Sequence, residues 1–262
     1  MTNGLQRQIW SDGARVRKGV MDRFLVPLWT GLLDATGATK GSKVLDAGCG
    51  SGELGILALA RGCDVTGIDL APQMIELCRA DPKLAGATYF ESSVESMPFE
   101  AGAFDAAIAS MSVHFCDDVP RAIAELFRVV KPGGTVGISA PFGLDLEAMI
   151  AFRLAIELVE EQYRGDIGRP LRFAPDGELV KALSTAGFTQ VSERELDTPL
   201  AAGSFEEIWN IQKVWAPLQL AANLVGEAEF LSAYQARLAL RTGSPTPSRL
   251  EMKYRIGTGV KA

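Results

Sequence analysis

Between residues 43 and 141, short apolar runs alternate with stretches whose apolar residues recur every three or four positions. The short runs predict strands, and the periodic stretches predict helices. Strands that are apolar along most of their length and alternate with helices are typical of a parallel sheet covered on both faces. In chain order the predicted strands are KVLDAG, DVTGID, ATYFESS, FDAAIAS and TVGISAP, with a KPGG turn before the last of them.

Helical patterns flank this region. Residues 14–35 predict one or two helices broken near Pro27, residues 143–163 and 204–241 predict further helices, and FTQVSEREL and RLEMKYRIGTGV predict two more strands. We expect a three-layer, Rossmann-like α/β fold: seven strands, mostly parallel, with right-handed crossovers and the last strand antiparallel next to the sixth. The expected parts are a helical cap (1–40), an α/β core (41–141), a lid insertion (142–174), the continued core (175–203), a second helical lid insertion (204–243) and the last strand (244–262).

Composition narrows the classes of function. The net charge is −6, from 26 basic and 32 acidic residues, which argues against nucleic acid as a partner. The four cysteines form no CxxC pair and the chain has one histidine, so we expect no metal site. The first ten residues lack a signal-peptide core and no apolar run is long enough for a membrane span. These features predict a cytoplasmic protein; they say nothing of its oligomeric state.

The first predicted strand ends in a glycine-rich turn, VLDAGCGSG, at residues 44–52. Glycines in such a turn supply left-handed backbone or let a ligand lie against the main chain. Asp69 ends the next predicted strand, where a carboxylate can hold the two hydroxyls of a ribose. Because Gly50, Gly52 and Gly55 also satisfy the dinucleotide fingerprint, the turn alone leaves NAD open beside other nucleoside cofactors.

Later motifs narrow the choice of cofactor. The stretches VLDAGCGSG, GIDLAPQMIELCR, ESMPFEAGAFDAAIASMSVHF and ELFRVVKPGGTVGIS follow in order within residues 40–141. This series resembles the class I S-adenosylmethionine-dependent methyltransferases, in particular the small-molecule branch that includes the ubiquinone/menaquinone-biosynthesis C-methyltransferases. The resemblance implies S-adenosyl-L-methionine as cofactor and S-adenosyl-L-homocysteine as product, and it fades beyond residue 142.

The resemblance also implies a set of cofactor-binding residues. The methionine end would lie on Asp46 and the Gly48–Gly50 backbone, the ribose on Asp69, and the adenine near Ser93 and Val94. The full set is Asp46, Ala47, Gly48, Cys49, Gly50, Asp69, Leu70, Met74, Ser93, Val94, Ser110 and Met111.

Two positions depart from the family pattern. Ser93 stands where the family usually has an aspartate for the adenine amino group, so Glu95 or Glu91 is a possible substitute. Ala71 stands where the family often has a serine cap, a loss of about 1 kcal/mol.

Two further side chains have alternative roles. His114 follows the fourth predicted strand, where an imidazole suits a general base for an acceptor that must lose a proton; packing or cofactor contact is the alternative role. Trp10 either closes over the cofactor, where its face suits a sulfonium, or packs the cap onto the core.

The acceptor would be bound by the lid insertions. Apolar side chains share one helical face there, which is typical of a packed core but also suits a small, largely apolar acceptor methylated at O, C or N; they are Phe205, Ile208, Ile211, Trp215 and Leu218, with Trp209 beside them. Tyr163, Arg164 and Arg169 are candidate substrate contacts. The alternatives to methyl transfer are a non-methylating enzyme that keeps the cofactor, an NAD(P)-dependent oxidoreductase and a regulatory binding module.

Overall fold

The computed structural model describes residues 2–14, 19–20, 22–143, 146–247 and 249–262. Seven strands form one sheet in the order β3-β2-β1-β4-β5-β9-β6. Their bounds are β1 Lys43–Ala47, β2 Asp64–Asp69, β3 Thr88–Glu91, β4 Phe104–Ser110, β5 Val130–Phe142, β6 Thr189–Asp197 and β9 Lys253–Val260. Strands β1 to β5 pair in parallel, and β9 lies antiparallel between β5 and β6. The expected mostly parallel sheet, with its last strand antiparallel beside the sixth, is confirmed.

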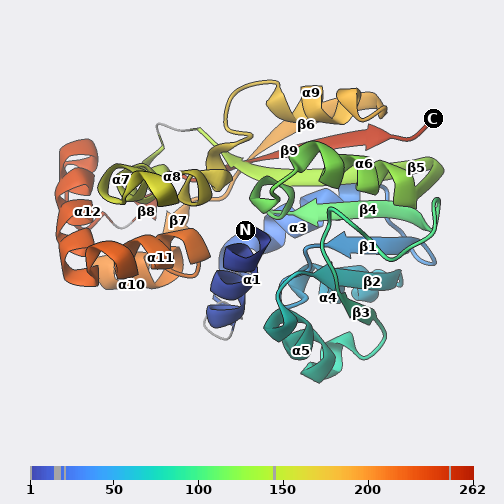
Figure 1. Cartoon of the computed structure of the whole chain (residues 1–262), viewed down its shortest axis with the longest axis horizontal. Helices are drawn as coiled ribbons and strands as arrows, with labels where there is room; N and C mark the ends of the chain where they lie inside the picture. Colours follow the sequence, from blue (N-terminus) through green and yellow to red (C-terminus); the bar gives the residue numbers. More distant parts are fainter. Residues whose placement is uncertain (1, 15–18, 21, 144–145, 248) are drawn as a thin grey trace.

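Helices cover both faces of the sheet (Figure 1). The helices around it are α1 Thr2–Asp12, α3 Asp22–Ala35, α4 Glu53–Ala60, α5 Pro72–Ala80, α6 Val119–Val129 and α9 Glu178–Thr185. In β1, Val44 belongs to the buried cluster that includes residues of α3 and α4, whereas Leu45 belongs to the one that includes residues of α6 and α9, and both side chains are fully buried. Consecutive strand residues point to opposite faces, so a strand that is apolar at every position is buried on both sides.

A second group of elements lies beyond the carboxyl ends of the parallel strands, at the left of Figure 1. It contains α7 Ile150–Leu158, α8 Glu161–Ile167, α10 Phe205–Gln212, α11 Ala216–Val225 and α12 Glu227–Thr242, with the short 3-10 turns η3 Glu147–Met149 and η4 Arg169–Leu171. The short strands β7 Leu200–Ala201 and β8 Arg249–Leu250 pair there as a small sheet of their own. We call this group the lid; its chain follows β5 and β6.

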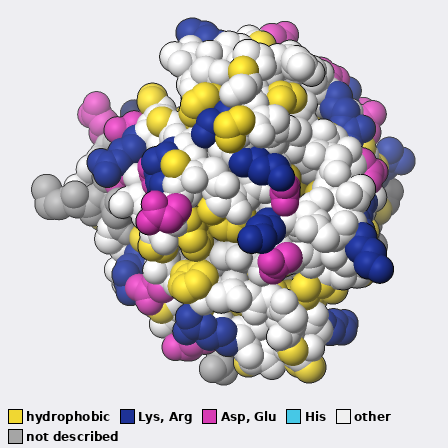
Figure 2. Space-filling view, turned by 90° about the vertical axis from the view of Figure 1, so that its right-hand side faces the viewer, with side chains coloured by type: hydrophobic (Ala, Val, Ile, Leu, Met, Phe, Trp, Pro, Cys, Tyr) yellow, Lys and Arg dark blue, Asp and Glu magenta, His cyan; other side chains and the backbone are white. Residues whose placement is uncertain are grey.

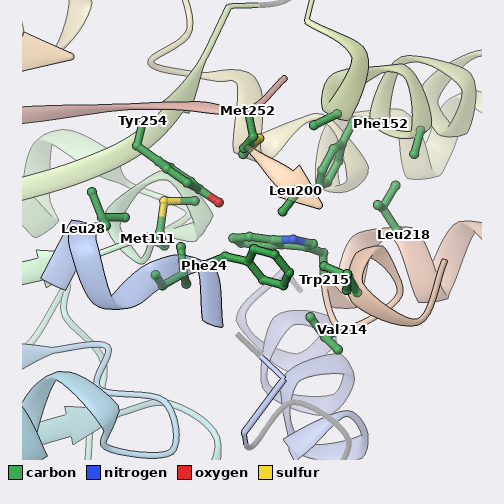
Figure 3. Packing of buried hydrophobic residues seen from close by; sticks show 14 of the residues in the cluster. Phe24, Leu28, Met111, Phe152, Leu200, Val214, Trp215, Leu218, Met252 and Tyr254 are labelled. Carbon is green, nitrogen blue, oxygen red and sulfur yellow. The ribbon is translucent and has the colours of Figure 1, made fainter. Parts of the chain in front are cut away.

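The lid docks on the core through a continuous apolar cluster. Trp215, at the start of α11, lies between Phe24 of α3 and Leu200 of β7, and Tyr254 of β9 points toward it (Figure 3). Trp215 is 4% exposed, and its ring lies 6.3 Å from that of Phe152 on α7, in an edge-on arrangement. The apolar stripe predicted for this segment therefore joins the lid to the core.

Several predicted local features need correction. Pro27 does not break a helix but lies inside α3. A proline removes one backbone hydrogen bond, but the helix is also held by Leu25, Leu28 and Leu32, which are at most 1% exposed each. The helix α1 lies within the expected helical cap, although no separate helix was predicted there, and the pairing of β7 with β8 and the helical part of residues 164–171 were not predicted. The KPGG segment does project from the sheet, because Val130 pairs with Phe104 and Thr135 pairs with Ala106.

The opposite end of the molecule, which faces away from the lid, carries basic and acidic side chains interspersed (Figure 2). Within the described ranges, the helices are too short or too polar to cross a membrane. The same residues contain no cluster of three or more histidine, cysteine, aspartate or glutamate side chains that could hold a metal ion.

Candidate functional site

Two adjoining cavities open at the carboxyl ends of β1, β2 and β4. The larger encloses about 700 Å³ and the smaller about 440 Å³ of space that continues into solvent. Gly48, Gly50, Ser110 and Met111 line both. The larger cavity is also lined by Asp69, Leu70, Met74, Ser93 and Val94, and the smaller by Asp46 and Cys49. The topology thus brings eleven of the twelve predicted cofactor residues to one place; Ala47 is fully buried and lines neither cavity.

The glycine-rich turn presents bare backbone to these cavities. Gly50 has φ +54°, and a Cβ built on it would meet nothing within 4 Å. Gly48 has φ +80°, but a Cβ there would lie 2.3 Å from that of Ser112. Gly48 is therefore required for packing within the protein, whereas Gly50 leaves its space to a ligand.

Asp69 holds this turn against the second strand. Its Oδ2 accepts a hydrogen bond from the Gly50 amide at 2.9 Å, and its Oδ1 accepts one from the Ala71 amide at 2.9 Å. The two bonds fix the carboxylate at the cavity wall. Each carboxylate oxygen has two lone pairs, so both can also accept a hydroxyl hydrogen bond from a ligand.

The Asp46 carboxyl group is buried, and one of its two oxygens lacks a hydrogen bond from the described residues. It is 1% exposed, lines the smaller cavity, and its Oδ2 has no hydrogen-bond partner among the described residues. Burial, followed by the charges of Asp69 and Glu53, raises the pKa of Asp46 to about 8. A cationic group in this cavity would favour the charged carboxylate and supply the missing hydrogen bond. The ammonium group of a bound amino acid fits this requirement.

The far end of the larger cavity is lined by Ser93, Val94 and Glu95. The Ser93 hydroxyl accepts a hydrogen bond from the Glu95 amide at 3.1 Å and keeps its own hydrogen to donate. Glu95 reaches the cavity, and its Oε1 accepts a hydrogen bond from the Asp117 amide at 2.7 Å. Glu91, the other candidate substitute for the missing aspartate, lies outside this lining and pairs with Arg7.

Met111 closes the wall between the two cavities in an unusual backbone conformation. Its φ is +54°, one of two positive values outside glycine among the described residues. Its amide donates to the backbone oxygen of Ser139 at 3.2 Å, which holds it there. Such a conformation costs about 1–3 kcal/mol and is common beside functional sites.

His114 is fully buried in the 3-10 turn Val113–Phe115 and lies outside both cavity linings. Its ring contacts the Phe115 ring at a centroid distance of 4.3 Å. The general-base role therefore stays a prediction, one that requires this turn to expose the ring during turnover.

Several cavity residues were not in the predicted set, among them Gln6 of α1. Trp10, for which closing over the cofactor was one of two predicted roles, also lines the larger cavity, and its indole N–H donates to Gln6 Oε1 at 3.1 Å. The Trp10 ring meets Phe115 edge-on at 4.8 Å. Leu25 and Trp29 of α3 line the smaller cavity. Trp29 precedes the glycine-rich turn in the sequence, but no motif spacing relates it to that turn.

The sequence of this chain is similar to that of known proteins over part of its length. Residues 45–138 match the family described as "Methyltransferase domain". A malonyl-[acyl-carrier protein] O-methyltransferase of Serratia marcescens is 38% identical over 105 residues, 40% of this chain and 40% of that protein. An uncharacterized protein of Mycobacterium tuberculosis is 34% identical over 132 residues, 50% of this chain and 47% of that protein. The chain thus spans half or less of the length of these two relatives.

Solved structures share the fold over most of the chain. The YcgJ protein of Bacillus subtilis superposes with a TM-score of 0.63 at 16% identity, covering 89% of this chain and 97% of that one. The [4+2]-cyclase SpnF superposes with a TM-score of 0.57 at 22% identity, covering 90% of this chain and 80% of that one.

Proposed function

We propose that this protein, whose residues 45–138 match a methyltransferase domain, is a class I S-adenosylmethionine-dependent methyltransferase that transfers a methyl group from S-adenosyl-L-methionine to a small, largely apolar organic acceptor. One observation carries the proposal: Asp69 is held at the wall of a cavity whose backbone is left open at Gly50. This arrangement suits a nucleoside lying against the main chain, with its ribose hydroxyls on the carboxylate.

The residues divide between the parts of the cofactor. We assign the methionine end to Asp46, Gly48 and Gly50, since the buried Asp46 oxygen needs a donor such as the ammonium group. We assign the ribose to Asp69, with Leu70 and Met74 against the ribose and the adenine, and the adenine edge to the Ser93–Glu95 segment. Trp10, from α1, covers this larger cavity.

Bound S-adenosylmethionine supplies a methyl group activated by a sulfonium charge, so the protein has mainly to align the acceptor and exclude water. The side chains best placed to do this surround the smaller cavity. Leu25, Trp29, Leu54 and Met111 place apolar side chains there beside the carboxyl groups of Asp46 and Glu53, and we assign a small apolar acceptor to the apolar side. No base is needed for an acceptor that carries a free lone pair, and His114 is the proposed base for one that must lose a proton.

The atom that is methylated, O, C or N, is set by the acceptor. The O-methyltransferase relative of S. marcescens matches over 40% of this chain. Because the match covers less than half of either protein, that relative's acceptor supports O-methylation only weakly.

Calorimetry with S-adenosylhomocysteine tests the cofactor assignment. We expect micromolar binding of S-adenosylhomocysteine and none of NAD. Asp69→Ala should weaken the binding at least tenfold, because hydrogen bonds to a charged group contribute about 1.5–3 kcal/mol. Asp64→Ala, at the exposed opposite end of the same strand, is the matched control and should bind as the unchanged protein does. Binding of NAD alone would overturn the assignment in favour of an oxidoreductase.

Transfer itself needs a separate experiment. Incubation with methyl-labelled S-adenosylmethionine and a panel of small apolar alcohols, acids, amines and enolisable ketones should give a labelled product. If the cofactor binds tightly while every acceptor, including those in cell extract, stays unlabelled, a non-methylating enzyme or a regulatory module becomes the better interpretation.

A further inference from the structure

An arginine of the lid reaches into the core beside the larger cavity. Arg169, in η4, is 3% exposed although it carries a full charge. Its Nη2 lies 2.6 Å from Asp117 Oδ1 and 2.7 Å from Asp166 Oδ1, and its Nη1 donates to the backbone oxygen of Phe115. These contacts occupy the guanidinium group, so Arg169 belongs to the protein's own structure and not to the substrate contacts predicted for it.

The segment that Arg169 holds is a wall of the larger cavity. Phe115 and Cys116 line that cavity, and the Phe115 ring meets Trp10 of α1 on the same lining. The next residue, Asp117, donates its amide hydrogen to Glu95, which also lines the cavity. A shift of this segment would therefore move cavity residues from two other parts of the chain.

A second arginine holds the same segment from the protein surface. Arg172 is exposed, and its Nη1 donates to the backbone oxygens of His114, at 3.2 Å, and of Cys116. The lid thus binds three consecutive carbonyl groups, those of residues 114–116, through two arginines.

The same cluster also reaches the helix that covers the cavity. Asp166 of α8 accepts a hydrogen bond from the Gln6 side chain at 3.5 Å, and Gln6 in turn accepts from the Trp10 indole at 3.1 Å. Asp166 Oδ1 accepts from the Arg169 Nε at 2.8 Å as well. One lid carboxylate therefore joins α1 to the arginine that fixes the opposite wall.

The arginine in this cluster holds its partners in one fixed arrangement. A guanidinium group is planar and presents its donors in a rigid fork, so it can hold two carboxylates and a carbonyl in one arrangement. A lysine has one compact charge on a flexible stem and cannot reproduce that arrangement. Buried ion clusters contribute little net stability but define geometry well where every member has a partner.

We propose that Arg169, assisted by Arg172, is a positioning residue for cofactor binding: from the lid it fixes the Phe115–Asp117 wall and, through Asp166, the α1 helix that covers the cavity. Docking of the lid and binding of the cofactor are then coupled through one polar cluster. The inference rests on the proposed cofactor, and it adds a role for a segment in which no family motif is found.

Calorimetric titration with S-adenosylhomocysteine tests this role. Arg169→Gln should weaken binding by roughly ten- to thirtyfold, which corresponds to about 1.4–2 kcal/mol, and Arg169→Lys should not restore it, because a lysine lacks the planar fork. Arg172→Gln should weaken binding by about two- to fivefold. Arg237→Gln is the matched control: it removes the same charge from an exposed lid ion pair with Glu157 and should leave affinity unchanged.

A second readout separates positioning from a general loss of structure. If Arg169 acts through the wall that Trp10 touches, the losses caused by Arg169→Gln and Trp10→Ala will not add in the double variant. Additive losses, or unchanged affinity in a folded Arg169→Gln protein, would overturn the inference. If Arg169→Gln fails to fold, Arg172→Gln decides, and normal affinity there overturns it.

The unchanged protein is titrated first, which keeps the two hypotheses apart. Absence of S-adenosylhomocysteine binding by that protein counts against the proposed function. Normal binding by the unchanged protein and by all arginine variants counts against the positioning role alone.

Discussion

The cofactor half of the sheet and the lid are built on different principles. In the first, backbone groups face the cavity, and their positions depend on a few specific residues such as Gly50 and Asp69. In the lid, side chains such as Trp215 fill space between helices, and many apolar residues would meet that need. A site formed by backbone groups requires particular residues and can therefore be recognised in the sequence as a motif. A region formed by packed side chains requires only apolar residues, so the sequence shows just an apolar pattern.

The sharpest separation of the two regions comes from Gly50→Leu. A Cβ there meets no protein atom within 4 Å, and a leucine side chain would extend from it into the cavity, so we expect a folded protein whose binding of S-adenosylhomocysteine falls more than about a hundredfold. Gly243→Leu, which has a similar positive φ at the end of α12 and equally open space, carries the same backbone strain and should bind normally. Titration calorimetry checks both; normal binding by the Gly50 variant would place the cofactor elsewhere.

The reverse pattern is expected for Trp215→Ala in the lid. Removing this buried ring should lower the free energy of unfolding by about 3–5 kcal/mol, as large-to-small changes of aromatic residues in cores do. Affinity for S-adenosylhomocysteine should change less than threefold at a temperature where the variant is folded, a limit set by roughly 0.6 kcal/mol. Urea denaturation and calorimetry measure the two effects. A large loss of affinity with little loss of stability would contradict the division between the regions.

A smaller effect is expected on how the free energy of unfolding depends on pH, through Asp46 in the cofactor half. Because the pKa of Asp46 is raised to about 8, the folded protein holds a proton that the unfolded chain loses near pH 4. Stability should therefore fall as pH rises from about 4 to 8, and Asp46→Asn should lack this contribution. Between pH 5 and pH 8, the unfolding free energy of the unchanged protein should fall relative to the variant by more than about 1 kcal/mol. The free energy of unfolding is measured by urea denaturation at each pH. If it changes with pH by the same amount in both proteins, Asp46 does not carry this proton.

The smallest effect is expected at the lid surface. Arg237 and Glu157 form an exposed ion pair at 2.7 Å between α12 and α7. Its loss in Arg237→Ala should change the free energy of unfolding by less than about 0.5 kcal/mol, since exposed pairs are screened and pay side-chain entropy. A loss above 1 kcal/mol in urea denaturation would mean that the lid depends on surface charge as well as on its apolar cluster.

The same contrast explains what could be predicted from the sequence. The mostly parallel sheet with its last strand antiparallel beside the sixth follows from the apolar pattern, and the wall formed by Gly50, Asp69 and Met74 follows from the motifs. Gln6 of α1 and Leu25 and Trp29 of α3 could not be assigned to the cavity walls, because they lie outside those motifs, and for Trp10 the sequence left two roles open. Burial of His114 depends on packing around a short turn, which no local pattern encodes.

The position of β9 has a consequence for how the chain is assembled. Strand β6 joins the large sheet only through β9, which is made after both lid segments. During synthesis, β1 to β5 can pair as soon as they emerge, since each finds its neighbour among strands already made. The sixth strand must wait, with one edge of β5 exposed, until the lid and then β9 have left the ribosome. The edge of β5 is thus the place where a newly made chain is most open to pairing with the wrong partner.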